Sequence, residues 1–145
     1  MDELFNLIIE QLKASVPELK WLDQDFGQLE VYENPPVLFP VALININIPQ
    51  WDDWKVASQQ FGNAEVIIKI GFDTRQQTNG AMPTLLRQQA LSHFETVRKC
   101  NKCLTGLRGE TCTMRRRAST LSHTSETGIK VYTVTYLAKI IESIV

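Results

Sequence analysis

The sequence is poor in the residues and patterns on which most catalysis depends. Its 145 residues include two histidines and three cysteines, and no 18 apolar residues run together as a membrane-spanning helix requires. The signatures G-x-x-x-x-G-K-S/T, G-x-G-x-x-G, H-E-x-x-H and G-x-S-x-G are all missing. With only His93 and His123, few histidine-based catalytic triads can be built. These absences predict a protein that is not an enzyme and that holds no cofactor and no metal.

The cysteine count and the first residues indicate where the chain works. Three cysteines are an odd number, and two of them stand only three positions apart, so a disulfide framework is not expected. The acidic start Met1-Asp2-Glu3 differs from the basic leader of a secretory signal. We therefore expect a reducing compartment.

The formal net charge of −1 hides an asymmetry along the chain. Residues 1–60 hold ten acidic and three basic residues, whereas residues 61–145 hold six acidic and twelve basic ones. The two halves either neutralise each other within one fold or give the molecule an acidic and a basic face. In the second case, copies would attract each other head to tail.

Hydrophobic periodicity predicts two helices and four main strands. Apolar residues recur every three or four positions in residues 2–15 and 83–103, as in amphipathic helices. They alternate with period two in residues 41–48 and 64–72, and strands are also predicted at 112–121 and 128–140. A short strand at 29–33 is a further prediction. Both faces of the last strand are fairly apolar, which predicts a central strand or one with a face in an intersubunit contact.

The order α-β-β-α-β-β predicts an α+β fold in one domain, residues 1–145. Paired strands separated by helices favour an antiparallel sheet of about four strands with two helices packed on one face.

An arginine cluster stands in the strand predicted at 112–121. Arg115, Arg116 and Arg117 are consecutive, and Arg98, Lys99, Lys102 and Arg108 add basic residues nearby. Three interpretations are open: a solvated strand edge whose charges discourage aggregation, an intersubunit salt-bridge surface, or contact with nucleic-acid phosphates. No aromatic residues interleave with the arginines, so base stacking is not expected.

The three cysteines raise the question of a metal site. Cys100 and Cys103 form a C-x-x-C, and Cys112 with His93 or His123 would complete four zinc ligands. A second closely spaced pair is missing, and the C-x-x-C falls at a helix C-terminus, where the dipole raises thiol pKa values. We expect inert, partly buried thiols.

Trp51 and Trp54 flank two aspartates in a predicted loop. Either they cover the end of the core or they contact a partner.

The order of these features resembles the tail terminators of tailed phages and prophages, also called tail completion or head–tail joining proteins. The residues that carry the resemblance are a helix at 4–16 followed by Pro17-Glu18-Leu19-Lys20-Trp21, then Phe39-Pro40-Val41-Ala42-Leu43-Ile44, Trp51, a strand at 64–72, a helix ending in Leu104-Thr105-Gly106, and Val131-Tyr132-Thr133-Val134-Thr135-Tyr136. The resemblance covers nearly the whole chain.

This resemblance implies a non-enzymatic structural subunit. Such proteins form a hexameric ring that caps the tail tube and joins it to the head connector, assembling in the host cytoplasm and ending in the virion tail. Neither nucleic acid nor a membrane is an expected partner. A ring needs one patch to meet a different patch on the neighbour. We expect Trp51, Trp54, Arg115, Arg116 and Arg117 to make those contacts. The alternatives are a small ligand-binding or enzymatic α+β domain, acting through carboxylates or Cys100, and a nucleic-acid-binding accessory that uses the arginine cluster.

Overall fold

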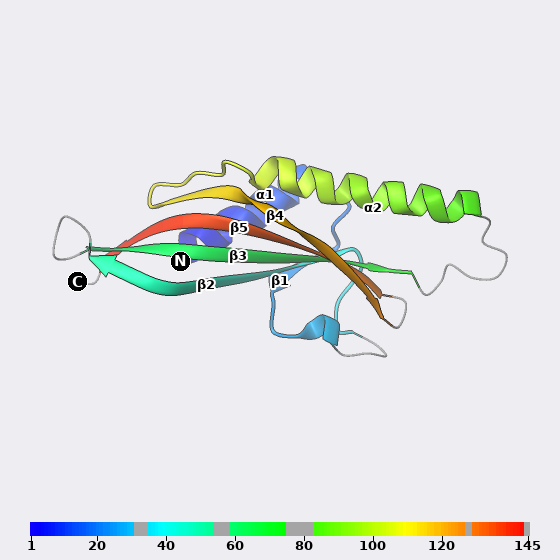
Figure 1. Cartoon of the computed structure of the whole chain (residues 1–145), viewed down its shortest axis with the longest axis horizontal. Coiled ribbons are helices and arrows are strands. Elements are labelled where there is room, and N and C mark those ends of the chain that lie inside the picture. The colour runs from blue at the N-terminus through cyan, green and yellow to red at the C-terminus, as the bar shows by residue number, and fades with distance from the viewer. Residues whose placement is uncertain (31–34, 54–58, 75–82, 127–128, 144–145) are drawn as a thin grey trace.

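A computed structural model describes residues 1–30, 35–53, 59–74, 83–126 and 129–143, the last two ranges in part as backbone only. The elements in chain order are α1 (Asp2–Ser15), β1 (Trp21–Gln24), the 3₁₀ helix η1 (Gln28–Glu30), β2 (Val41–Asp53), β3 (Gln59–Asp73), α2 (Pro83–Leu104), β4 (Cys112–Glu126) and β5 (Ile129–Ser143). Figure 1 shows long strands flanked by the two helices. The fold is α+β, as predicted.

Both helices lie where the hydrophobic periodicity predicts them. In α1 the side chains of Leu4, Ile8 and Leu12 are buried, which is the stripe expected from steps of three and four residues. The longer α2 ends at Leu104, and Gly106 follows with a φ of +82°, a conformation that glycine adopts without strain.

The sheet has five strands in the order β1-β2-β3-β5-β4, so the prediction of about four strands is one too few. It is also not wholly antiparallel, because β1 pairs parallel with β2. The other neighbours are antiparallel, and β5 is a central strand, which confirms one of the two predictions made for it. The four residues of β1 are too few to show a period in the sequence.

The region before β2 differs from the sequence prediction. Instead of a strand at 29–33, the chain forms η1 at 28–30, and residues 31–34 lie outside the described part. The buried side chain of Gln28 explains the turn: its Nε2 donates to the Gln24 carbonyl at 2.8 Å, and its Oε1 accepts from the Phe26 amide at 2.9 Å. These local bonds take the place of a strand ladder.

The strand predicted at 41–48 continues to Asp53, into the predicted loop. A register shift between Asn47 and Gln50 contains Pro49, after which pairing with β3 resumes. Proline is accepted there because a bulge leaves its residues outside the ladder.

The main core lies between the helices and one face of the sheet. Even-numbered strand residues such as Ile44, Ile68 and Tyr136 point towards the helices and join one cluster with Ile8 and Leu104. Both helices therefore cover the same sheet face, as predicted. No helix among the described residues is long and apolar enough to cross a bilayer.

Candidate assembly surfaces

The structure places Trp51 and the three arginines near opposite edges of the sheet. Trp51 lies in β2, whereas Arg115, Arg116 and Arg117 lie in β4, and β3 and β5 separate the two strands. Only the backbone of the arginines is described, and Trp54 lies outside the described residues. One chain therefore does not bring the tryptophan and the arginines together. Two such positions can meet only between copies.

Trp51 is half-buried and packs against the core. It stands opposite Gly62 of β3, and a Cβ on that glycine would lie 2.9 Å from its Cε3 atom. The missing side chain of Gly62 thus makes room for the indole ring. Covering the end of the core is therefore one role that Trp51 has.

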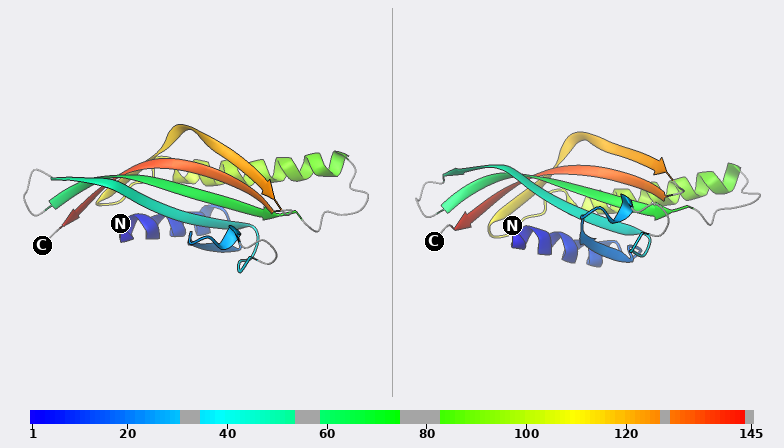
Figure 2. Two further views of the ribbon diagram at one scale, coloured as in Figure 1. Left: turned by 60° about the horizontal axis from the view of Figure 1, so that its bottom comes forward. Right: turned by 90° about the horizontal axis from the view of Figure 1, so that it is seen from below.

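The sheet face turned away from the helices is covered at one end by an irregular segment of the chain. There Val41, Leu43 and Gly71 are buried, and a Cβ on Gly71 would lie 3.2 Å from Cδ1 of Leu29 and 3.4 Å from Cε1 of Phe39. An ion pair of 3.3 Å between Asp25 Oδ2 and Lys69 Nζ joins the covering segment to β3. Figure 2 shows this segment, with η1, against one end of the sheet. We call residues 25–30 and 35–40 the cover.

Beyond the cover, several described residues of the same face reach solvent, although Thr135, which pairs with Ile67, is buried. Asn45 and Asn47 of β2 are exposed there, and Leu137 of β5 is 41% exposed. The partly exposed residues Phe61, Ile67 and Ile141 share this face, which follows from their register with Asp52, Asn45 and Phe61. We call this region the open face. Charged residues share this face, because Glu65 is paired with Leu137 and Lys139 with Asn63, so the open face combines amide, aliphatic and charged side chains.

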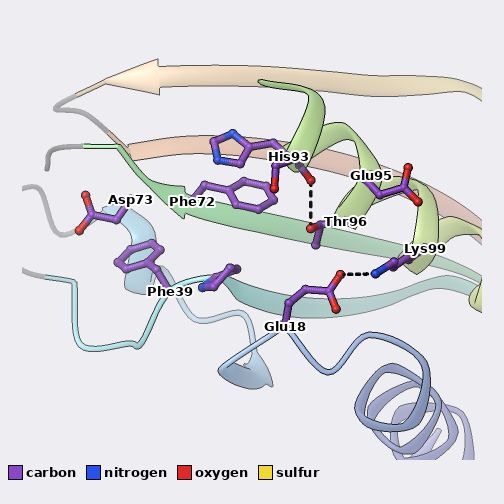
Figure 3. Close-up of a pocket in the computed structure, with 10 residues that line it drawn as sticks. Glu18, Phe39, Phe72, Asp73, His93, Glu95, Thr96 and Lys99 are labelled. Atoms are coloured by element: carbon purple, nitrogen blue, oxygen red, sulfur yellow. Dashed lines mark hydrogen bonds and ion pairs between the residues drawn. The ribbon is translucent and has the colours of Figure 1, made fainter. Parts of the chain in front are cut away.

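A pocket of about 430 Å³ lies on the helix side, between α2, the start of β2 and the end of β3. Figure 3 shows Glu18 turned towards Lys99, with 3.1 Å between the carboxylate and the ammonium. Asp73 lies at one end of the pocket and Glu95 at the other, where its carboxylate pairs with Arg98 at 2.6 Å. The acidic groups therefore do not converge on one point.

His93 is the titratable ring in this pocket, and it is held in an apolar stack. Its ring lies 4.0 Å from that of Phe72, and Nδ1 is buried with no hydrogen bond to any described residue. Burial, and then the charge of Lys130, lower its pKa. The ring is therefore neutral at pH 7. Because no carboxylate among the described residues orients the ring, these residues do not show the arrangement of a general base with its partner.

The cysteines are thiols that resist ionisation. Burial raises the pKa of Cys100 to about 12 and that of Cys112 to about 11, and it also raises that of Cys103. Thiolate is the form that binds metals and attacks electrophiles. Within the described residues, no three His, Cys, Asp or Glu side chains are grouped as metal ligands.

Several ion pairs join the acidic first part of the chain to its basic second part. Besides Asp25–Lys69 and Glu18–Lys99, the amino terminus pairs with Glu142. Internal neutralisation, the first interpretation of the charge asymmetry, is therefore present in the Asp25–Lys69 and Glu18–Lys99 contacts, whereas the pair with Glu142 joins a cation of the first part to an acid of the second.

The open face was predicted only in part, as one of two alternatives for the last strand, in which one of its faces makes an intersubunit contact. Its sequence signal is the aliphatic content of both faces of β5, which includes Leu137 and Ile141 on the face away from the helices. A strand that is central in its sheet explains that content equally well, so the sequence alone does not locate the exposed region.

No protein-family model matches the chain, and no curated protein does. Among solved structures, the chain is similar to one from the virion of a native gene transfer agent particle. The match has 11% identity, covers 95% of this chain and 94% of that one, and has a TM-score of 0.49. A likeness of this size is not evidence of a shared function.

Proposed function

We propose that this chain is a non-enzymatic structural subunit that works by assembling with copies of itself. The observation that carries the proposal is the open face, where Ile67, Leu137 and Ile141 reach solvent at least in part. Exposed aliphatic area on a rigid sheet is suited to contact with another protein. The polar pocket supports the enzymatic alternative less well, because its acidic groups do not converge.

The resemblance to tail terminators gives the proposal its specific form. The assembly is a ring, a hexamer by resemblance, that caps a tail tube and joins it to a head connector. It forms in the host cytoplasm and becomes part of a virion tail. Trp51, Trp54 and the three consecutive arginines, Arg115 to Arg117, are its proposed contact residues. The place of Trp51 in β2 and of the arginines in β4 suits the head-to-tail contact that a ring requires.

The test is the mass of the purified protein by light scattering over a wide concentration range, with electron microscopy of the heaviest species. We expect a closed oligomer visible as rings. A monomer at every concentration would contradict self-assembly.

A matched pair of variants tests the part played by the open face. Leu137→Ser removes aliphatic area from it, whereas Leu91→Ser makes the same change on α2, where the leucine is 59% exposed. We expect the first variant to weaken the oligomer and the second to leave it unchanged. Equal behaviour of the two variants would exclude the open face as a contact.

A further inference from the structure

The outer edge of β4 is blocked at its beginning by the chain itself. The Gly106 amide donates to the Met114 carbonyl at 2.9 Å, the Met114 amide to the Leu107 carbonyl at 2.8 Å, and the Gly109 amide to the Cys112 carbonyl at 2.9 Å. From Arg115 to Glu126, no described residue pairs with this edge. A strand edge of this kind presents unpaired amides and carbonyls to another strand.

The outer edge of β2 is likewise blocked at the beginning of the strand. Strand β1 pairs with residues 41–44, and the Asp25 amide makes the last bond, 2.9 Å long, to the Ile44 carbonyl. From Asn45 to Asp53, this edge has no backbone partner among the described residues. Each edge of the sheet is therefore half blocked and half open.

The two open stretches extend towards opposite ends of the sheet. One row across the sheet is formed by Ile46, Val66, Tyr136 and Arg116. From this row, the open edge of β4 extends in one direction along the strands, and the open edge of β2 extends in the opposite direction. Figure 2 shows β2 and β4 at the two edges. Because each pairing between them is antiparallel, β4 runs opposite to β2. A second copy in the same orientation therefore brings its β2 antiparallel to β4.

Antiparallel pairing of these stretches matches opposite charges. The open part of β4 starts with Arg115-Arg116-Arg117, and the open part of β2 ends with Asp52-Asp53. The start of one antiparallel strand meets the end of the other, so the arginines come opposite the aspartates. Attraction between them would favour this register over others.

The directions of the backbone groups agree with this register. Successive residues of an antiparallel strand point their amide and carbonyl to alternate sides. In β4, the amide and carbonyl of Met114 point away from β5, so those of Arg116 do too. In β2, the amides and carbonyls of Gln50 and Asp52 point towards β3, so those of Trp51 and Asp53 point away from the sheet. Because Met114 is already bonded to Gly106 and Leu107, the register that stays within the open stretches places Arg116 opposite Asp53 of the next copy, with Asp52 opposite Arg117.

We propose that copies of this chain join edge to edge, β4 from Arg115 onwards pairing antiparallel with residues 45–53 of β2 in the next copy. This inference rests on the proposed self-assembly. Arg116 lies in the row of Val66, and Asp53 in the row of Gln60, so each copy is displaced along the strands by about six residues, or about 20 Å. A fixed stagger per copy is what a sheet needs to close on itself with tilted strands.

A charge exchange tests the pairing. We expect the triple variant R115E/R116E/R117E and the double variant D52R/D53R each to lower the association constant at least about tenfold at low salt. Combining all five changes restores the complementary charges and with them the assembly. Loss in each variant without restoration in the combination would overturn the proposed register.

A backbone variant tests the edge independently of charge. Ile46→Pro removes an outward amide from β2 without removing a bond to β3, and Ile46→Ala is its matched control, since it loses side-chain contacts but keeps the amide. We expect only the proline variant to lose assembly while both keep the circular dichroism of the wild type. If the wild type assembles and neither the charge nor the proline variants weaken it, edge pairing is wrong and the proposed function stands. A wild type that stays monomeric contradicts both.

Discussion

One face of one strand shows how the covered and open regions of the sheet differ. On the face of β2 away from the helices, Val41 and Leu43 lie under the cover and are fully buried, whereas Asn45 and Asn47 are exposed. The period of two continues through all four residues, and only the chemistry of the side chain changes. The position where aliphatic residues give way to asparagines thus marks the place where the cover ends.

The largest expected effect comes from the same substitution on the two sides of that boundary. Leu43→Ala removes a side chain that is 0% exposed, so it should lower the free energy of unfolding by about 3 kcal/mol. Leu137→Ala on the open face should lower it by less than about 1 kcal/mol. Urea unfolding of both variants, at a concentration where the protein is monomeric, measures the difference. Equal losses would mean that the open face is packed as tightly as the covered one.

A smaller effect is expected from adding volume on each side. In Gly71→Val, the new Cβ would lie 2.9 Å from Cγ1 of Val41, and the added methyl groups would crowd the site further. This variant should lower the free energy of unfolding by about 2 kcal/mol. Asn45→Val adds a β-branched residue on the exposed side of the boundary and should change the free energy of unfolding by about 0.5 kcal/mol or less. Urea unfolding of these two variants, again at a concentration where the protein is monomeric, measures both effects. A well-tolerated valine at position 71 would show that the cover moves aside easily.

Removing the ion pair that joins the cover to β3 should have a smaller effect still. Lys69 is partly exposed, so Lys69→Met should cost about 0.5 to 1 kcal/mol, and the difference from wild type should shrink as salt is added. Unfolding measured at low and high ionic strength checks both parts of this prediction. A difference that does not depend on salt would assign the loss to packing rather than to charge.

The covered end should also contribute a pH dependence. The pKa of His93, stacked on Phe72, is lowered in the folded state from its ordinary value of 6.5, so the unfolded chain binds a proton first. Its contribution to stability is complete above pH 6.5 and is lost as pH falls from there through the lowered pKa. His93→Phe keeps an aromatic ring without the titration, so its stability should fall less between pH 7 and pH 5. Unchanged pH dependence in this variant would exclude His93 as its source.

The parts of the fold that the sequence predicts are those whose pattern is local. Ile44, Ile46 and Ile48 alternate within one strand, and Leu4, Ile8 and Leu12 recur within one helix, so each element is visible in its own residues. The continuation of β2 past Pro49 was missed because a register shift accommodates the proline, and such a shift depends on the partner strand. The parallel pairing of β1 was missed because it also depends on a partner strand, β2.

The candidate site was only partly predictable. Three consecutive arginines on a strand predicted an edge or a contact, and β4 is an edge strand. That Trp51 and the arginines lie on opposite edges depends on the order β1-β2-β3-β5-β4, which no local pattern contains. The cover over Gly71 was also hidden, because its irregular segment has no period.

The short return of residues 106–109 along the start of β4 has a consequence for the free protein. Like β1 on the other edge, it occupies part of a strand that would otherwise be open along its length. Identical molecules stacked directly above one another in register would meet these occupied stretches and could not form a continuous cross-β ladder. The two occupied stretches therefore disfavour fibrous aggregation of the free chain.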